Sequence, residues 1–500
     1  NTKKVYLARD RAGKKPLYIW QKDSGIVFSS ELKVLNQVIN PGINKSAINE
    51  YLYLGYCFKT HTAYKNVREL ENGTYLQIDA ENNEYKIERW FDIEKFYERK
   101  VSLTHNEALS ALDEKLNKAV QCRLESSDVP VGAFLSGGID SGLITAIASK
   151  YKNNLSTFTI RLPGDYDESA LAFQVAQKYN TTHAAIDISF DNLQQDFEMI
   201  VGNYGEPFRE SSAIPTYYVS KAAKEYITVV LNGDGADELF GGYRRYVPFR
   251  HFDFFSSSEI MQLFFTKFSS IVTIAHEKKS MYNYIYRLMK FAGYKDLVKM
   301  YSSVTNDLFV GYESAFKQMP RLNSIRNMLN RLKTLNASSL QKLLIADFNN
   351  LFFSSLLPKM DIGTMAHSLE GRSPFLSKDI LEFAPSIHDK YKINGFTTKY
   401  LLRLLAKKYL PQQLIHQPKR GFEVPLKKWI DNDLNNILQD YLFSSNTLYS
   451  DFINEKFVTD LYKKRINISD EKRAKMLYCI LCLEIWYKQL KEQPAFHQFV

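Results

Sequence analysis

The 500-residue sequence is poor in cysteine and has no long uninterrupted apolar run. Four cysteines are too few for a disulfide scaffold, so we expect a protein of a reducing, cytoplasmic compartment. The most apolar stretch, Ile260–Ile274, is interrupted by Lys267, which argues against a membrane-spanning helix because such a helix needs about 20 apolar residues. Glycine (22) and proline (15) are not in excess, which excludes a collagen-like or low-complexity chain.

Basic side chains outnumber acidic ones, with 65 Lys and Arg against 55 Asp and Glu, a net charge of +10 and a pI near 9.0. Such a balance is typical of proteins that bind nucleic acid or anionic surfaces. Here the basic residues are spread thinly, and clusters such as Lys427-Lys428 alternate with acidic or apolar residues. We therefore expect solvated faces, with no nucleic-acid and no membrane partner. The net positive charge would also suit an anionic small substrate such as a nucleoside triphosphate.

The sequence opens at Asn1 and enters an apolar alternation at Val5-Tyr6-Leu7. We expect it to be a piece of a longer chain. Its length predicts about three domains, or two large ones. Residues up to about 95 read as β-rich and incomplete, with no visible partner for the first strand. The strands predicted there are Lys4–Ala8, Pro16–Trp20, Gly25–Ser29, Thr74–Ile78 and Tyr85–Trp90.

The pattern changes at Thr104, where Thr104 and Glu107 form a capping box before a long helix. Continuous apolar strands then alternate with helices, which predicts an α/β fold with a parallel sheet covered on both faces. Residues from about 250 to 500 are mostly helical in period. The predicted strands are Val131–Leu135, Ser156–Ile160, Ala184–Ile188 and Ile227–Leu231, and the helices between them are Ser141–Tyr151, Glu168–Tyr179, Leu193–Tyr204 and Ile214–Tyr226.

The strongest local signal is the string Ser136-Gly137-Gly138-Ile139-Asp140-Ser141, between a buried strand and a helix. Two glycines let the backbone approach an anion and adopt positive φ, and the helix N-terminus presents free amides. Ser136 and Ser141 add hydroxyl groups, and Asp140 supplies a hard oxygen that suits Mg²⁺ on phosphates. The string lacks the Walker pattern, so transfer of the γ-phosphate is not the expected reaction.

A second acidic loop follows the last of these strands, where Asp234, Asp237 and Glu238 lie within five residues. Ligands bind at the carboxyl ends of parallel strands, and clustered carboxylates repel one another unless a cation compensates them. We expect this loop to share a metal ion with Asp140. The alternative is a polar turn that caps a helix.

These strings resemble the asparagine synthetase family, and the first resembles the PP-loop of the ATP pyrophosphatases. The resemblance extends over nearly the whole chain. It is carried also by Leu7–Tyr18, Phe28–Lys33, Met365–Leu376 (similar to the family's substrate-side helix), Lys399–Arg403 and Lys419–Phe422. It implies the C-terminal part of an Ntn-type class II glutaminase domain over residues 1–97. Residues 98–500 would then form a HUP-like ATP pyrophosphatase domain with a helical C-terminal part.

The resemblance implies ATP and Mg²⁺ as cofactors and assigns a role to each matching residue. Asp234 and Lys399 would be catalytic, and Asp140 and Asp237 would hold Mg²⁺. Weaker candidates for the amino-acid pocket are Glu206, Glu210 and Arg372, for which a structural salt bridge is an equal alternative. The implied ATP-binding residues are Leu135, Ser136, Gly137, Gly138, Asp140, Ser141, Ile160, Asn232 and Gly233.

The implied reaction is amidation of L-aspartate through β-aspartyl-AMP, with ammonia that comes from glutamine in the full-length chain. The family's nucleophile is an N-terminal cysteine, and none of the four cysteines of this sequence is at the chain start. We therefore expect this piece to use ammonia but not glutamine. Cys479 and Cys482 lie in an apolar helical run, where core packing is expected. A homodimer is compatible with the resemblance.

Departures from the family pattern leave the acceptor open. Asn232 stands where Ser is usual and Glu210 where Asp is usual, and Gly371-Arg372-Ser373 replaces the commoner Val-Arg-Val. One alternative is therefore an amidotransferase that acts on another carboxylate, of a surface polysaccharide, a peptide or a natural product. A second alternative is a nucleotide-binding protein without turnover, against which the intact acids and Lys399 argue.

Overall fold

The computed structural model describes residues 3–22, 25–58, 60–79, 81, 84–162, 167–187, 193–250, 294, 296–305, 308–415 and 424–492. Ile260–Ile274 and the motif Lys419–Phe422 lie outside these residues, as does Ile188 at the end of one predicted strand. None of the described helices combines the length and the apolar character needed to cross a membrane.

The N-terminal part contains two three-stranded antiparallel sheets, with the strand orders β1-β5-β6 and β3-β2-β4. The expectation that the first strand has no visible partner is wrong, because β1 pairs with β5 from Lys4 opposite Asp79 to Ala8 opposite Tyr75. The partner lies some 70 residues away, so a local pattern does not reveal it. The elements are β1 (Lys4–Ala8), β2 (Tyr18–Lys22), β3 (Gly25–Ser29), α1 (Leu32–Ile39), α2 (Lys45–Leu54), β4 (Val67–Glu69), β5 (Thr74–Asp79) and β6 (Tyr85–Arg89).

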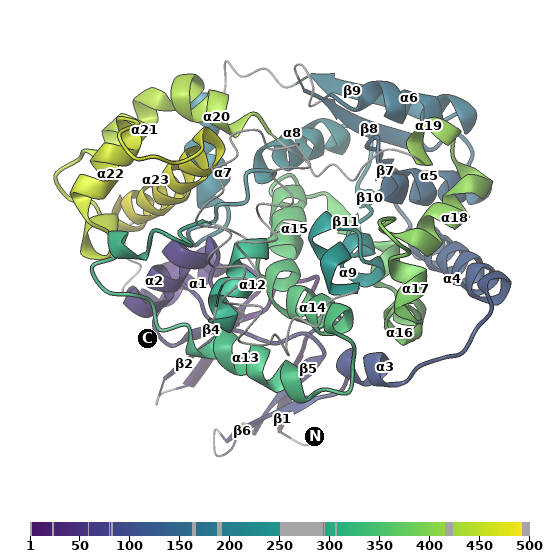
Figure 1. Ribbon diagram of the computed structural model, residues 1–500, viewed down its shortest axis with the longest axis horizontal. Coiled ribbons are helices and arrows are strands. Elements are labelled where there is room, and N and C mark those ends of the chain that lie inside the picture. The colour runs from purple at the N-terminus through teal and green to yellow at the C-terminus, as the bar shows by residue number, and fades with distance from the viewer. Residues whose placement is uncertain are drawn as a thin grey trace.

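The second part is built on a five-stranded sheet of order β11-β10-β7-β8-β9, and all of its strand pairs are parallel. This confirms the predicted parallel sheet. Helices α4, α5 and α18 pack together on one side of it, and α8 and α15 pack together on the other (Figure 1). The strands are β7 (Val131–Phe134), β8 (Ser156–Arg161), β9 (Thr182–Asp187), β10 (Val229–Leu231) and β11 (Glu370–Arg372).

The edge strand β11 is absent from the predicted elements, because Met365–Leu376 resembles a helix. In the structure, helix α15 (Leu357–Met365) ends at the start of that segment. Ser368 has a φ of +54°, a left-handed conformation that turns the chain out of the helix. Residues Glu370–Arg372 then pair with β10, with Val230 opposite Gly371. Tertiary pairing thus overrides the helical period in this segment.

The helices of the second part begin with α3 (Glu94–Glu98) and α4 (His105–Glu125), and the capping box of α4 is confirmed. The Thr104 amide donates to Glu107 Oε2 at 2.8 Å, and Thr104 Oγ1 accepts from the Glu107 amide at 3.3 Å. The predicted helices of the sheet region are α5 (Ile139–Tyr151), α6 (Ser169–Lys178), α7 (Leu193–Gly202) and α8 (Ala213–Lys224).

Later residues are mainly helical, as predicted. The helices there are α9 (Ala236–Phe240), α12 (Leu297–Thr305), α13 (Asn323–Thr334), α14 (Ser339–Asp347), α15, α16 (Lys378–Ser386), α17 (Asp389–Lys392), α18 (Tyr400–Tyr409), α19 (Gln412–Ile415), α20 (Leu426–Lys428), α21 (Asn435–Leu442), α22 (Glu455–Tyr462) and α23 (Asp470–Glu492), with a π-helical segment at Phe348–Leu356.

One hydrophobic core joins the two parts of the chain. The Tyr51 hydroxyl on α2 donates to the carbonyl of Cys479 on α23 at 2.9 Å, and Asn350 Nδ2 donates to the Tyr56 hydroxyl at 2.8 Å. Cys479 and Cys482 are buried free thiols within α23, in agreement with the expectation of core packing. The sheet β3-β2-β4 therefore shares the interior of the second part, whereas Leu7 of β1 and Leu76 of β5 belong to a separate small cluster.

A buried ion pair stabilises the N-terminal part, and an exposed pair of the same length provides its control. Arg9 Nη2 and Glu69 Oε1 are 2.6 Å apart with side chains 1% and 9% exposed, and Lys3 Nζ and Glu81 Oε1 are also 2.6 Å apart but 66% and 64% exposed. We predict that Glu69→Ala lowers the free energy of unfolding by about 3–5 kcal/mol, because it leaves the buried guanidinium of Arg9 without a carboxylate partner. Glu81→Ala leaves it nearly unchanged, because water screens that pair. Urea unfolding of both variants tests the contrast, and equal losses would contradict it.

Candidate active site

The loop between β7 and α5 is held by the hydroxyl groups of its two serines. The Ser136 amide donates to Ser141 Oγ at 3.0 Å, the two Oγ atoms lie 2.9 Å apart, and the Gly138 amide donates to Ser136 Oγ at 3.2 Å. Positive φ is not what the glycines provide, which corrects that expectation: Gly138 has a φ of −89°, and Gly137 is not among the residues with positive φ. A Cβ on Gly137 would lie 2.9 Å from the Cβ of Glu168, so close packing against the start of α6 requires this glycine.

The loop after β10 lies directly against the first loop. A Cβ on Gly233 would lie 2.9 Å from the Cβ of Asp140, so the absence of a side chain permits this approach. Asn232 Oδ1 accepts from Ser373 Oγ at 2.6 Å and from the Asp234 amide at 3.2 Å, which fixes the start of the loop. Gly235 has a φ of +93°, a conformation that favours glycine, and it leads into α9. The carboxyl ends of two neighbouring parallel strands thus bring both acidic loops together.

The buried ammonium of Lys399 lies between two of the predicted acids. Its Nζ is 2.5 Å from Asp140 Oδ2 and 2.7 Å from Asp237 Oδ1, and its side chain is only 2% exposed. Lys399 itself precedes α18 with a φ of +51°, an uncommon conformation for a residue with a side chain. The structure therefore brings together three residues that lie on three different elements.

The same carboxylates have the chemistry expected of a magnesium site. Asp140 Oδ1 is buried and accepts no hydrogen bond from the described residues. Hard carboxylate oxygens suit Mg²⁺, and this ion usually takes one or two protein carboxylates together with phosphate oxygens. No group of three or more metal-ligating side chains occurs among the described residues. Asp140 and Asp237 thus fit Mg²⁺ when a nucleotide supplies further oxygens.

A cavity of about 430 Å³ opens beside both loops. Its size lies within the range of small-molecule sites. Its lining combines apolar and acidic side chains, so it can accept an aromatic base and a charged group at the same time. The lining includes Phe134, Leu135, Ser136, Asp140, Ser141, Phe158, Ile160, Glu210, Val219, Asn232, Gly233, Asp234, Asp237, Glu238, Tyr243, Lys359, Met360 and Lys475.

Several predicted site residues do not line this cavity. Glu206 is buried against the N-terminal part, where its Oε2 accepts from the Ala63 amide at 3.0 Å. Arg372 pairs with Glu370 at 2.9 Å and donates to the carbonyl of Arg123 at 2.8 Å, which is the arrangement of a structural salt bridge. Gly137, Gly138 and Lys399 lie in or beside the two loops but are not part of the lining. Glu210 is the one weaker substrate candidate that the structure places at the cavity.

The comparisons with known proteins cover both parts of the chain. The family model described as asparagine synthase matches residues 111–488, and the model described as glutamine amidotransferase domain matches residues 1–91. The chain belongs to the asparagine synthase family.

Curated relatives in this family match at low identity over long stretches. The asparagine synthetase [glutamine-hydrolyzing] 1 of Bacillus subtilis is 28% identical over 97% of this chain and 75% of its own length. A putative asparagine synthetase [glutamine-hydrolyzing] 2 of Methanocaldococcus jannaschii is 35% identical over 50% of this chain and 49% of its own. The amidase chyE of Penicillium rubens is 22% identical over 99% of this chain and 78% of its own.

Two residues that line the cavity, Glu238 and Lys359, are not among the site residues predicted from the sequence. Glu238 lies 2.6 Å from the hydroxyl of Tyr243, which donates to it, and burial next to Asp237 raises the pKa of Glu238 to about 7. Its signal in the sequence is the crowding of three carboxylates within five residues. Lys359 is a buried cation on α15. Its signal is a lysine that follows the apolar residues Leu356 and Leu357 in a buried helical segment.

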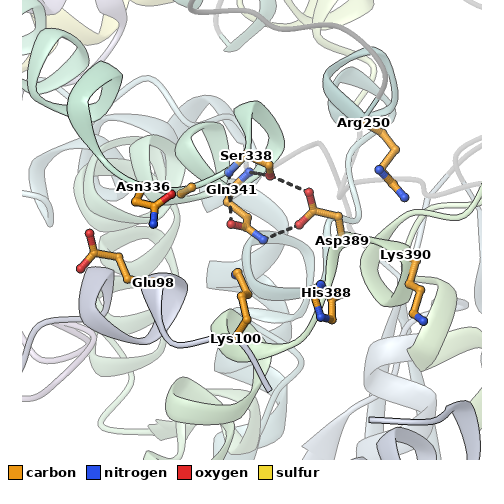
Figure 2. A pocket seen from close by; sticks show the side chains of 10 residues that line it. Glu98, Lys100, Arg250, Asn336, Ser338, Gln341, His388, Asp389 and Lys390 are labelled. Atoms are coloured by element: carbon orange, nitrogen blue, oxygen red, sulfur yellow. Dashed lines mark hydrogen bonds between the residues drawn. The ribbon is translucent and has the colours of Figure 1, made fainter. Parts of the chain in front are cut away.

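A second, more open cavity of about 480 Å³ contains none of the predicted site residues (Figure 2). It lies where α3, α14 and α17 meet. Its acidic residue Asp389 accepts hydrogen bonds from Ser338 Oγ at 2.5 Å and Gln341 Nε2 at 2.6 Å, as Figure 2 shows. Ser338 and Gln341 form the capping box of α14, so this carboxylate serves the start of a helix. The acidic residues of this cavity, Glu98 and Asp389, thus belong to elements other than the two loops that follow β7 and β10.

The burial of Glu206 predicts a pH-dependent stability. Burial raises the pKa of Glu206 to about 8 from its ordinary value of 4.5. Between these two values the folded state keeps a proton that the unfolded state loses, so the free energy of unfolding falls as the pH rises from 4.5 to 8. For this group the fall is on the order of 4 kcal/mol. We expect Glu206→Gln, which keeps an acceptor for the Ala63 amide, to lose that part of the slope in urea unfolding at pH 5 and pH 8. The exposed Glu81→Gln is the control, and an unchanged slope in Glu206→Gln would refute the assignment.

Proposed function

We propose that the protein is an ATP-dependent ligase that converts L-aspartate to L-asparagine. The β-carboxylate would attack the α-phosphorus of ATP and release pyrophosphate, and ammonia would then displace AMP from β-aspartyl-AMP. The observation that carries the proposal is the Asp140–Lys399–Asp237 arrangement beside a nucleotide-sized cavity, in a chain of the asparagine synthase family.

The loop of Ser136–Ser141 would act as a PP-loop of the ATP pyrophosphatase type. The start of the 13-residue helix α5 presents free backbone amides to phosphate oxygens. Ile160 and Leu135 are apolar residues of the cavity lining, against which the base would bind, and Asn232 and Gly233 would close the nucleotide site. Mg²⁺, held by Asp140 and Asp237, would supply positive charge to the pyrophosphate when bound. The Lys399 ammonium would stabilise negative charge that develops on the transferring phosphoryl group.

Residues 1–97 would form the C-terminal part of an Ntn-type glutaminase domain, and residues 98–500 the synthetase domain. The match of a glutamine amidotransferase model to residues 1–91 supports this division. ATP, L-aspartate and ammonia would be the partners, in the cytoplasm. Ammonia would come from glutamine in a longer chain that carries the nucleophilic cysteine.

Pyrophosphate exchange into ATP tests the acceptor directly. We expect exchange with L-aspartate that exceeds that with any other member of a carboxylate panel, and L-asparagine as the product when ammonia is added. A second candidate is an amidotransferase with another carboxylate acceptor, which the match of the amidase chyE over 99% of the chain favours. Strong exchange with a different acid, and none with L-aspartate, would select this second candidate. Exchange with no acid would contradict both.

Asp234 would assist the deprotonation of the incoming ammonia. It lines the cavity between two glycines, so its short side chain can approach an acyl carbon there. We predict that Asp234→Asn lowers amide formation by a factor on the order of 10²–10⁴ and leaves ATP binding intact, because only the acid–base group is lost. Asp234→Glu is the matched variant and retains measurable activity. The measurement is ATP binding, AMP release and amide formation side by side, and an undiminished amide rate in the Asn variant would remove Asp234 from the mechanism.

A further inference from the structure

Lys359 is a buried cation that lines the cavity, and its ammonium group has no partner among the described residues. The residue is 8% exposed and lines the cavity from α15. Among the described residues, no hydrogen bond or ion pair reaches its ammonium group, and only its backbone carbonyl is engaged, by the Tyr204 hydroxyl at 3.3 Å. Lysines are almost never buried to this degree unless they are paired. An anionic group in the cavity would supply the missing partner.

Glu210 provides the opposite charge in the same cavity. Its Oε1 accepts from Ser212 Oγ at 2.9 Å, and its side chain lines the cavity from the loop between α7 and α8. Tyr204 connects the two positions, because its hydroxyl contacts the carbonyl of Lys359 while burial and the charge of Glu210 both raise the pKa of that hydroxyl. Tyr204 is stacked on Phe208 at a ring distance of 3.9 Å.

Lys359 and Glu210 contribute opposite charges to the lining of the same cavity. Within the described part of the chain, neither of them takes part in an ion pair. A buried ammonium and a half-buried carboxylate that line the same cavity are complementary to a ligand that carries both charges with the opposite arrangement. An α-amino acid is such a ligand.

We propose that Lys359 and Glu210 bind the α-carboxylate and the α-ammonium group of the acceptor. This inference rests on the proposed function and narrows its substrate to an α-amino acid with a second carboxylate. When Lys359 and Glu210 bind both α-groups, the side-chain carboxylate is the only acid of the substrate that remains free to react. It would react in the part of the cavity that Asp234 lines. The pair thus determines which of the two carboxylates of the substrate is activated.

Substrates that lack one charged group allow each contact to be tested alone. β-Alanine is L-aspartate without its α-carboxylate, and succinate is L-aspartate without its amino group. We expect Lys359→Met to lower kcat/KM for L-aspartate by a factor on the order of 10–100, the range for a lost charged hydrogen bond, and to leave that for β-alanine within a few-fold. Glu210→Gln should lower the value for L-aspartate similarly and leave that for succinate within a few-fold. The readouts are pyrophosphate release, KM for ATP and the Kd of L-aspartate by calorimetry.

Controls separate binding from folding. Lys359→Arg keeps the charge and should restore most of the lost affinity for L-aspartate. Lys378→Met removes a lysine that is 59% exposed on α16 and should change nothing. Thermal unfolding of each variant identifies any loss of structure.

The outcomes distinguish this inference from the proposed function. An unchanged Kd for L-aspartate in Lys359→Met, or an equal loss for L-aspartate and β-alanine, would overturn the inference while the proposed function stands. A raised KM for ATP in the same variant would assign Lys359 to phosphate instead and would also overturn it. If the wild-type protein neither binds L-aspartate nor releases pyrophosphate with it, the proposed function fails, and the inference fails with it.

Discussion

The site depends on one buried ammonium that holds two acidic loops together. Asp140 and Asp237 follow adjacent strands, and without Lys399 between them their charges would repel in a place that water hardly reaches. Burying these charges is costly, and only the close geometry of the two ion pairs offsets that cost. The left-handed backbone of Lys399 is part of the same arrangement, since strained conformations persist where the surroundings determine them fully. The missing side chain of Gly233, which lets the second loop approach Asp140, belongs to the same arrangement.

The fold places three kinds of surface around one cavity. The carboxyl ends of β7 and β10 supply the loops and the acids, because parallel neighbours end at the same edge of the sheet. The ends of β7 and β8 supply apolar side chains, and α15 and the α7–α8 loop supply a cation and a carboxylate. One cavity thus offers apolar, acidic and basic side chains to a ligand.

Local sequence patterns predicted the elements well and their long-range contacts poorly. The bounds of β1 and β3 agree to the residue, and the loop of Ser136–Ser141 lies at the predicted strand–helix junction. The β1–β5 pair and strand β11 were missed because they depend on partners far along the chain. The distances of Glu206 and Arg372 from the cavity follow from packing between elements, which no spacing encodes. The roles in catalysis and the boundary at residue 97 remain predictions.

The contact between Tyr51 and Cys479 has a consequence for how the chain is made. These residues are 428 positions apart, and the second of them lies in the last described helix. At about 5–20 residues per second, a ribosome needs roughly 20–90 s to add the residues that lie between them. Throughout that interval the apolar face of α2, with Tyr51 and Leu52, has no C-terminal helix to cover it. The nascent chain therefore depends on chaperones, or on transient contacts of its own, for longer than a protein whose domains close one after another.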